Sequence, residues 1–306
     1  MKCRKVMGAL GLFAAMLLAA PAAVWAQGDY LDSEIVRVKP DKVADFETIA
    51  KKIADANRKA NGDRWLAEVS IYGEGNVYVF TSRRDSYADI DKGNDMFMAA
   101  VTKTFGKDAA MKLLNDFNNC IISSRSELFR RRPDLSSKMP TDPQALNKMV
   151  GESRVLRVAE IRIRYGHVPD FENYMKDVVS HIAENPNTQP VLVSQLVEGG
   201  RGGATFHLVF FRSGLAGFDN NPSLKSMVDE DTYARFEKTI AEIEAGSEST
   251  IYRFAPELSN PPKEIAEVAT DYWNPKPVMA MSHPKPKAAT GAESTPTAKP
   301  AEKPKN

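Results

Sequence analysis

Histidines are the side chains of this 306-residue chain best suited to acid–base or metal chemistry near neutral pH, and there are four of them. His207 stands between Phe206 and Leu208 in an apolar, strand-like run, where it could face a protein interior as a haem ligand, a base or a hydrogen-bond donor. A hydrogen-bonded core histidine is the alternative interpretation. No second histidine or carboxylate stands beside it at metal-ligand spacing, so the sequence predicts neither a metal site nor a cofactor. The others are expected on an exposed turn, a helix surface and the C-terminal tail: His167, His181 and His283.

Arginines recur at matched places in the two halves of the chain. Arg37 and Arg162 lie in a predicted first strand, and Arg130 and Arg253 in a predicted last strand. Side chains alternate between the faces of a strand, so Arg37 points inward if its apolar neighbours face the helices. With Arg130 pointing the same way, the interior would hold four guanidinium groups, suited to a carboxylate or phosphate ligand. The alternative is an internal salt-bridge set with Glu68, Glu127 and Glu160, because an enclosed cation is nearly always paired.

Aromatic side chains crowd the predicted middle strands, and Tyr78 is one of them. They could line an apolar pocket, although core packing between two sheets explains the same residues. The glycine runs 73–75 and 199–203 join two strands and lack the Gly-Lys-Ser/Thr end of a phosphate-binding loop. The chain also lacks a Gly-x-Ser-x-Gly turn and a Cys–His signature, which disfavours a hydrolase.

The two halves also repeat each other in sequence. Val36–Glu47 matches Ile161–Glu172 at an offset of 125 residues, and Ser124–Ser136 matches Ser247–Ser259 at an offset of 123. Two matched ends at almost the same offset predict a tandem duplication. Each copy has the pattern strand, helix, hairpin, helix, strand, which is the βαββαβ order of a ferredoxin-like unit. The predicted strands are 35–39, 65–72, 77–82 and 127–131, then 160–164, 191–197, 205–212 and 250–254; the second helix of each copy is predicted at 108–121 and 231–243.

A single unit of this kind leaves one apolar sheet face bare, at a cost of about 25 cal/mol per Å². Two copies on one chain can bury these faces against each other. In the openings Val36–Glu47 and Ile161–Glu172 and in the repeated βαββαβ order, the sequence resembles the dimeric α/β-barrel superfamily in its tandem single-chain form. The resemblance implies an α+β fold of two tandem ferredoxin-like units forming a pseudo-dimeric α/β barrel. Members include cofactor-free monooxygenases, haem-binding enzymes, aldoxime dehydratases and small stress-responsive proteins, so the fold alone selects no activity.

The first residues predict a cleaved signal peptide. Basic residues at positions 2, 4 and 5 precede the apolar run 10–20, and small residues at 24 and 26 suit a cut between Ala26 and Gln27. We therefore expect a periplasmic or secreted protein with no integral membrane segment after cleavage. Cys120 is then the one remaining cysteine, which excludes an intramolecular disulfide.

Composition and charge narrow the range of partners. With 42% hydrophobic and 26% charged residues the chain is ordinary globular material, and its formal charge of +1 argues against a nucleic-acid binder. From Pro275 onward the chain is rich in proline, lysine and alanine, which predicts disorder. Its excess of lysines suits either a solubilising tail or weak contact with an acidic envelope surface.

Together these observations divide the chain into a signal peptide (1–26), a first unit (27–137), a linker (138–152), a second unit (153–262) and a disordered tail (263–306). They predict an exported, non-catalytic protein that binds a small molecule between its halves or is purely structural. The alternative is a barrel enzyme resembling the cofactor-free or haem-dependent monooxygenases. The candidate ligand-binding residues are His207, Arg37, Arg162, Arg130, Arg253 and Tyr78.

Overall fold

The computed structural model describes residues 30–200, 204–219 and 222–275, so the predicted signal peptide and residues 276–306 lie outside it. Eight strands close into one barrel in the order β1-β3-β2-β8-β5-β7-β6-β4. All neighbouring pairs are antiparallel. The strands are β1 (Tyr30–Val38), β2 (Leu66–Tyr72), β3 (Val77–Arg84), β4 (Ile121–Arg131), β5 (Val155–Ile163), β6 (Leu192–Glu198), β7 (Ala204–Arg212) and β8 (Glu244–Phe254).

The barrel consists of two successive βαββαβ units, which confirms the predicted fold class. The first unit contributes β1 to β4 and the second β5 to β8, and the units join where β2 pairs with β8 and β4 pairs with β6. The helices are α1 (Val43–Ala60), α2 (Tyr87–Phe105) and α3 (Lys107–Asn119) in the first unit, α4 (Pro143–Glu152) between the units, α5 (Val168–Ile182), α6 (Leu224–Met227) and α7 (Glu230–Ile243) in the second, and α8 (Lys263–Ala266) and α9 (Thr270–Trp273) at the end.

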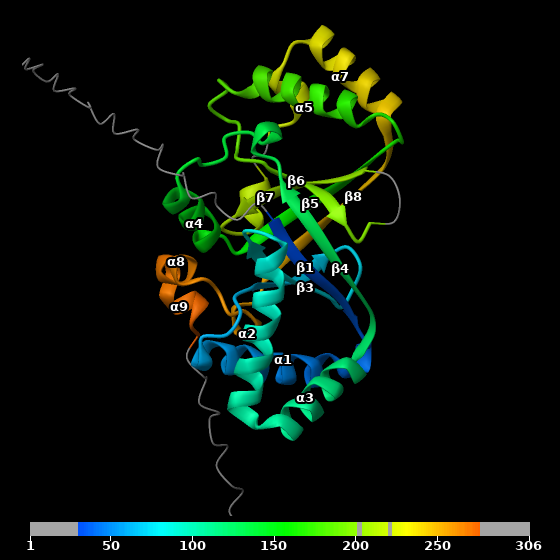
Figure 1. Ribbon diagram of the computed structural model, residues 1–306. Helices are drawn as coiled ribbons and strands as arrows, with labels where there is room; N and C mark the ends of the chain where they lie inside the picture. Colours follow the sequence, from blue (N-terminus) through cyan, green and yellow to red (C-terminus); the bar gives the residue numbers. More distant parts are fainter. Residues whose placement is uncertain (1–29, 201–203, 220–221, 276–306) are drawn as a thin grey trace, which may run out of the picture. The chain divides into compact units, whose positions relative to one another are not determined.

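The long helices cover the outside of the barrel. Figure 1 shows α5 and α7 on one side of the strands and α1 and α3 on the opposite side. Their apolar residues recur at helical spacing, so that Phe46 of α1 and Phe171 of α5 are fully buried against the outer faces of the strands. Local signals fix the helix ends: Asp142 and Asp229 accept hydrogen bonds from backbone N–H groups in the first turns of α4 and α7.

A short 3-10 turn follows the closing strand of each unit and connects it to the other unit. These turns are η2 (Pro133–Leu135) after β4 and η4 (Pro256–Leu258) after β8. The hydroxyl of Ser136 accepts a 2.9 Å hydrogen bond from the N–H of Val193 in β6. In the same way, the hydroxyl of Ser259 accepts a 2.8 Å bond from the N–H of Ala67 in β2. Each unit therefore ends by satisfying a buried backbone group of its neighbour.

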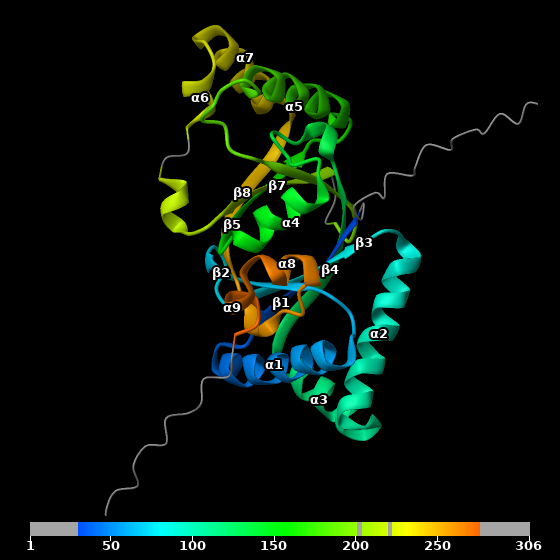
Figure 2. The ribbon, with the colours of Figure 1, turned by 90° about the vertical axis from the view of Figure 1, so that its left-hand side faces the viewer.

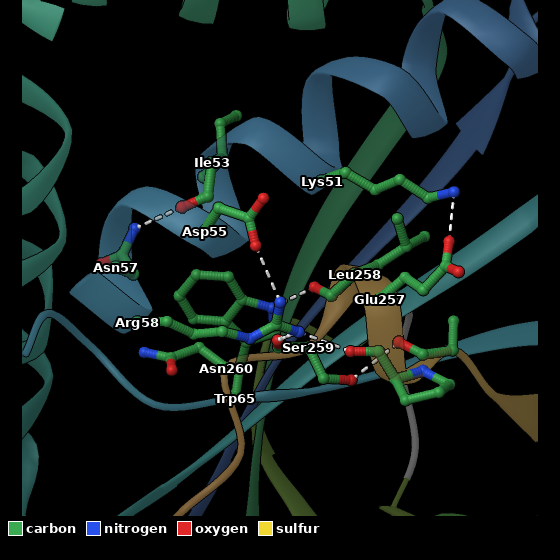
Figure 3. Close-up of polar contacts among 12 residues, drawn as sticks. Lys51, Ile53, Asp55, Asn57, Arg58, Trp65, Glu257, Leu258, Ser259 and Asn260 are labelled. Carbon is green, nitrogen blue, oxygen red and sulfur yellow. Dashed lines mark hydrogen bonds and ion pairs between the residues drawn. The ribbon is translucent and has the colours of Figure 1, made fainter. Parts of the chain in front are cut away.

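The turn η4 is also held by α1, as Figure 3 shows. The Arg58 guanidinium donates to the carbonyl of Pro256 at 2.6 Å and also to the carbonyl of Ser259. Trp65 donates from Nε1 to the carbonyl of Leu258 at 2.8 Å. These bonds provide partners for three carbonyls in the turn after the last strand.

The structure corrects several sequence-based boundaries. Residues 263–275 are not part of a disordered tail: they form α8 and α9, and Trp273 is fully buried against Phe254. The predicted linker contains α4. The closing strands β4 and β8 begin six residues earlier than predicted, and the prediction omitted α2, whose side chains are mostly exposed. Among the described residues, no helix is long and apolar enough to cross a membrane.

Candidate functional site

The barrel encloses a cavity of about 210 Å³, lined by alternate residues of all eight strands. Its wall is mostly apolar, with side chains such as Val79, Val158 and Phe211. One end is closed by residues of α4 and α8, including Leu146 and Ile265. Figure 2 shows these two helices lying across the front of the strands. Since a single water needs roughly 10–15 Å³ of comparable volume, the cavity has room for a small molecule.

Glu68 on β2 is the most perturbed acid of this cavity. Its side chain is buried, and Thr81 on the neighbouring strand donates a 3.4 Å hydrogen bond to it. Within the described part of the chain, no basic nitrogen lies within 4.0 Å of its carboxylate. Burial raises the pKa of Glu68 to about 8. The group is therefore largely protonated at neutral pH and can donate a hydrogen bond to a ligand.

His207 on β7 also faces the cavity, opposite a carboxylate on the next strand. Its Nε2 lies 3.6 Å from Oε2 of Glu160, and both side chains are about one-fifth exposed. The two residues are direct Cα partners in the pairing of β5 with β7. The neighbouring His207 lowers the pKa of Glu160. The ring of Phe129 lies against the imidazole, 4.2 Å between centroids. This pair could take up a proton from a bound ligand.

An ion pair between Arg125 and Glu127 lies further along the cavity wall. Arg125 on β4 donates from Nε to Oε1 of Glu127 at 2.7 Å, and Glu127 is buried. Nearby on β8, burial and then the charge of Glu68 raise the pKa of Tyr252 to about 12. Tyr252 therefore remains a neutral hydroxyl across the physiological range.

A second, more polar cavity of about 440 Å³ lies at the barrel mouth away from α4 and α8. At this mouth Arg37 forms an exposed 2.8 Å ion pair with Glu74. The two cavities have lining residues in common: Ile35, Arg125, Glu248, Thr250 and Tyr252. The interior and the mouth therefore meet across these side chains.

The structure brings only some of the predicted ligand-binding residues to these cavities. His207 lines the interior and Arg37 lines the mouth. Arg162 occupies the position on β5 that pairs with Gly246, is exposed, and is not among the residues lining either cavity.

The other three predicted residues point away from the interior. Tyr78 packs beneath α1, where its hydroxyl donates to Oε1 of Glu47 at 2.8 Å and its ring contacts Phe46. Arg130 and Arg253 are exposed and alternate with residues that line the cavity. The predicted interior cluster of four guanidinium groups is therefore wrong. The alternative, in which these arginines pair with buried glutamates, is also wrong in its partners. Glu127 pairs with Arg125, and Glu160 lies beside His207.

Nε2 of His207 lies beside the Glu160 carboxylate, and one face of the imidazole lies against the ring of Phe129. Among the described residues, no group of three or more His, Cys, Asp or Glu side chains is placed to hold a metal ion.

The closed eight-stranded barrel of two βαββαβ units defines a dimeric α/β-barrel protein whose two halves belong to one chain. The chain is similar to solved structures of an anthrone oxidase-like protein (9% identity, 76% of this chain and 93% of the other, TM-score 0.48), a haem-binding protein from Thermus thermophilus (11%, 76% and 93%, 0.41) and the chlorite dismutase from Candidatus Nitrospira defluvii (8%, 79% and 96%, 0.41). At these identities the similarity concerns the fold alone. No family model and no curated protein matches the chain.

Proposed function

We propose that this protein is exported to the periplasm or the outside of the cell, where it binds a small, largely apolar molecule inside its barrel without transforming it. One observation carries the binding proposal: the two halves enclose open space where a purely structural barrel would pack side chains. A mostly apolar wall with a few polar groups is typical of small-molecule sites. The neutral Glu68 carboxyl would orient the ligand through one hydrogen bond.

Native mass spectrometry of the protein purified from its own host tests binding directly. A reproducible mass excess is expected, and the variant Val158→Phe should lose it because the new ring fills the cavity that Val158 lines. Val197→Phe, at an exposed position, is the matched control and should retain the excess. A clean apo mass for the wild type, together with a higher melting temperature for Val158→Phe, would instead indicate an unoccupied space that a structural barrel tolerates.

The export proposal rests on the N-terminal pattern and is tested separately. The mature protein should begin at Gln27, and deletion of residues 2–26 should retain the protein inside the cell. Deletion of 276–306 tests the weak envelope contact that we propose for the basic tail: unchanged envelope fractionation would remove that part of the proposal.

The two units are further proposed to descend from one duplicated segment. Val36–Glu47 and Ile161–Glu172 lie 125 residues apart, and Ser136 and Ser259 lie 123 residues apart. These nearly equal spacings support this origin, and the two serines also make equivalent hydrogen bonds. Related sequences that contain a single unit and assemble as dimers would support it further.

A second candidate is a cofactor-free barrel enzyme, favoured by the base pair His207–Glu160 and the neutral acid Glu68, which line the same cavity. His207 would take a proton from an acidic C–H of the ligand while Glu68 donates a hydrogen bond to the developing oxyanion. The carbanion then reacts with O2. One oxygen atom becomes a ketone on that carbon, and the other leaves as water with the two hydrogens of the original methylene.

The probe 1,8-dihydroxyanthrone tests this candidate because it carries such a methylene. The enzyme interpretation predicts faster quinone formation and oxygen uptake with the wild type, and at least a tenfold loss in His207→Ala. The exposed Arg130→Ala variant should keep the wild-type rate. A rate equal to that of buffer would leave binding alone as the proposed function.

A further inference from the structure

The capped end of the interior cavity, which α4 and α8 close, holds an arginine that no carboxylate contacts. Arg83 and Thr81 lie on the same face of β3, and both line the cavity. Nη1 of Arg83 donates a 3.3 Å hydrogen bond to Oδ1 of Asn147 on α4, whereas its Nε is buried without a hydrogen-bond partner. Within residues 30–200, 204–219 and 222–275, no carboxylate oxygen lies within 4.0 Å of its guanidinium. One neutral amide is thus the hydrogen-bond partner of this cation.

Two other arginines show how this protein satisfies a guanidinium that is partly or fully buried. Arg84, on the opposite face of β3, donates to both carboxylate oxygens of Asp63 at 2.7 Å and to Asp32 at 3.2 Å. In the same cavity as Arg83, Arg125 donates to Glu127 at 2.7 Å. An enclosed cation is nearly always paired in this way. Arg83 therefore has room for an anionic partner that the described part of the chain does not supply.

The surroundings of Arg83 make a negative ligand group favourable. Burial lowers the pKa of Arg83, and the exposed carboxylates of Asp85 and Glu264 offset this effect only in part. A guanidinium nevertheless keeps its charge at neutral pH. Because opposite charges attract each other more strongly where water is excluded, an anion beside Arg83 would offset the cost of burying this charge.

A second arginine adds positive charge to the same end. Arg64 also lines the cavity, and it donates to amide and carbonyl oxygens, of which Oδ1 of Asn260 is the nearest at 3.0 Å. Neither Arg64 nor Glu248 forms an ion pair with any residue that the structure describes. Glu248 lies at the mouth, and burial keeps Glu68 largely protonated. The capped end therefore attracts an anion, whereas the mouth does not.

We propose that the capped end binds the carboxylate of an apolar monocarboxylic acid, with Arg83 as its charged partner, while the hydrocarbon part of the acid lies along the barrel wall toward the mouth. The planar guanidinium matches the geometry of a carboxylate, and side chains such as Val79 and Val158 provide the apolar wall. A second anionic group at the other end of the ligand would meet Glu248. This inference rests on the proposed binding function and specifies the class of ligand.

Three probes with the same eight-carbon chain test the preference for an anion: octanoate, 1-octanol and octylammonium, titrated into the protein at pH 7.5 by isothermal titration calorimetry. Their head groups are negative, neutral and positive at this pH. Octanoate should bind at least tenfold more tightly than either of the others. Because a charged head group leaves water less readily than a hydroxyl, a cavity without a cationic partner would prefer 1-octanol. Binding of 1-octanol as tight as that of octanoate would therefore overturn the proposal.

Variants test the assigned residue. Arg83→Gln should weaken octanoate at least tenfold and leave the affinity for 1-octanol unchanged, because the variant removes only the charged partner. Arg130→Gln removes one charge from the outer face and should bind both probes as the wild type does. Val158→Phe should lose both probes, because the new ring fills the space that their chains occupy. Unchanged octanoate affinity in Arg83→Gln, with folding checked by circular dichroism, would overturn the assignment.

A second substitution covers the case in which Arg83→Gln does not fold. Arg83→Lys keeps the charge and loses the planar fork, so it should bind octanoate more weakly than the wild type and still prefer it to 1-octanol. Loss of that preference in Arg83→Lys, or an octanoate affinity equal to that of the wild type, would overturn the assignment.

The same titrations separate this proposal from the binding function on which it rests. If 1-octanol binds and octanoate shows no preference, only the carboxylate proposal fails. If no probe binds, the carboxylate proposal fails as well, and native mass spectrometry then shows whether the binding function fails with it.

Discussion

The two units have the same arrangement of strands but present different side chains to the barrel interior. In the first unit Ile35 pairs with Val79 across β1 and β3, and both line the cavity. At the equivalent place in the second unit, Glu160 pairs with His207 across β5 and β7. An apolar pair in one unit thus corresponds to an acid–base pair in the other.

The asymmetry continues around the wall, whereas the junctions between the units are alike. Glu68 of β2 corresponds to Ser194 of β6, since these residues follow Ala67 and Val193, the amides bound by the two turn serines. Both units thus make the same serine hydrogen bond at their junction, whereas Glu68 and Glu160 each have an uncharged residue at the equivalent position of the other unit. The two units therefore share their scaffold contacts and differ in the side chains that they present to the cavity.

The largest expected effect concerns the buried acid of the first unit. The carboxyl of Glu68 has a pKa of 4.5 in the unfolded chain and of about 8 in the folded protein. Between these two pH values the unfolded chain has lost the proton and the folded protein keeps it. The free energy of unfolding therefore falls as the pH rises through this range. Glu68→Gln should remove that fall, on the order of 4 kcal/mol by pH 8.5, in urea unfolding at pH 5 and 8.5.

Glu160→Gln is the matched control in the second unit. Because His207 lowers the pKa of Glu160, that carboxylate adds stability above its ordinary pKa, and this stability is lost as the pH falls through the lowered value. Glu160→Gln should therefore change the pH dependence in the opposite direction to Glu68→Gln, and it should do so below about pH 4.5, in urea unfolding measured at pH 3 and 5. A pH dependence that Glu68→Gln leaves unchanged would contradict the asymmetry in the wall.

The next effect concerns the arginine that holds η4. Arg58→Ala should lower the free energy of unfolding by about 2–3 kcal/mol, because two carbonyls lose a charged donor. The second unit has Ala183 at the position 125 residues further on, so η2 has no equivalent arginine from α5. Hydrogen exchange should accelerate around 255–260 in this variant. The exposed neighbour Lys59→Ala should change little; equal losses in both variants would refute a specific role.

The turn serines should have smaller and nearly equal effects. Ser136→Ala and Ser259→Ala each leave a buried backbone N–H unpaired, at a cost of about 1–2 kcal/mol. Chemical denaturation of both variants measures this directly. A large loss in one and none in the other would show that the junctions differ as much as the wall does.

The smallest effect is expected on the outer face. Arg130→Ala and Arg253→Ala should each change the free energy of unfolding by less than about 0.5 kcal/mol and leave ligand mass unaltered, because both side chains are exposed. A loss of the bound ligand in either variant would place a binding role on the outside of the barrel.

The order of strands and helices along the chain was predictable, because the matched openings and ends delimit the two βαββαβ units. The helix α2 was not, since only Gly93, Ala100 and Val101 of its 19 residues are buried and its apolar stripe is correspondingly weak. The ordered end at Trp273 was hidden by the proline- and lysine-rich composition of the segment that follows it.

The candidate site was only partly predictable. His207 could be singled out as a histidine in a mostly apolar strand, but its partner Glu160 is 47 positions away and is set by the strand register. In β4 apolar residues fall on both faces, at Leu128 and Phe129, so alternation could not decide which way Arg130 points. Nor does sequence reveal that Glu68 lacks a cationic neighbour, since that depends on strands from both units.

The crossed serine bonds have a consequence for how the chain acquires its structure. The amide of Ala67 donates to the hydroxyl of Ser259, which lies 192 residues later in the chain. One edge of β2 likewise has no partner until β8 has been synthesised. Contacts this distant in sequence slow folding, because a long loop must close before they form. The first half made alone would be left with an open sheet edge, so the barrel is expected to fold as one cooperative unit after synthesis has passed Ser259.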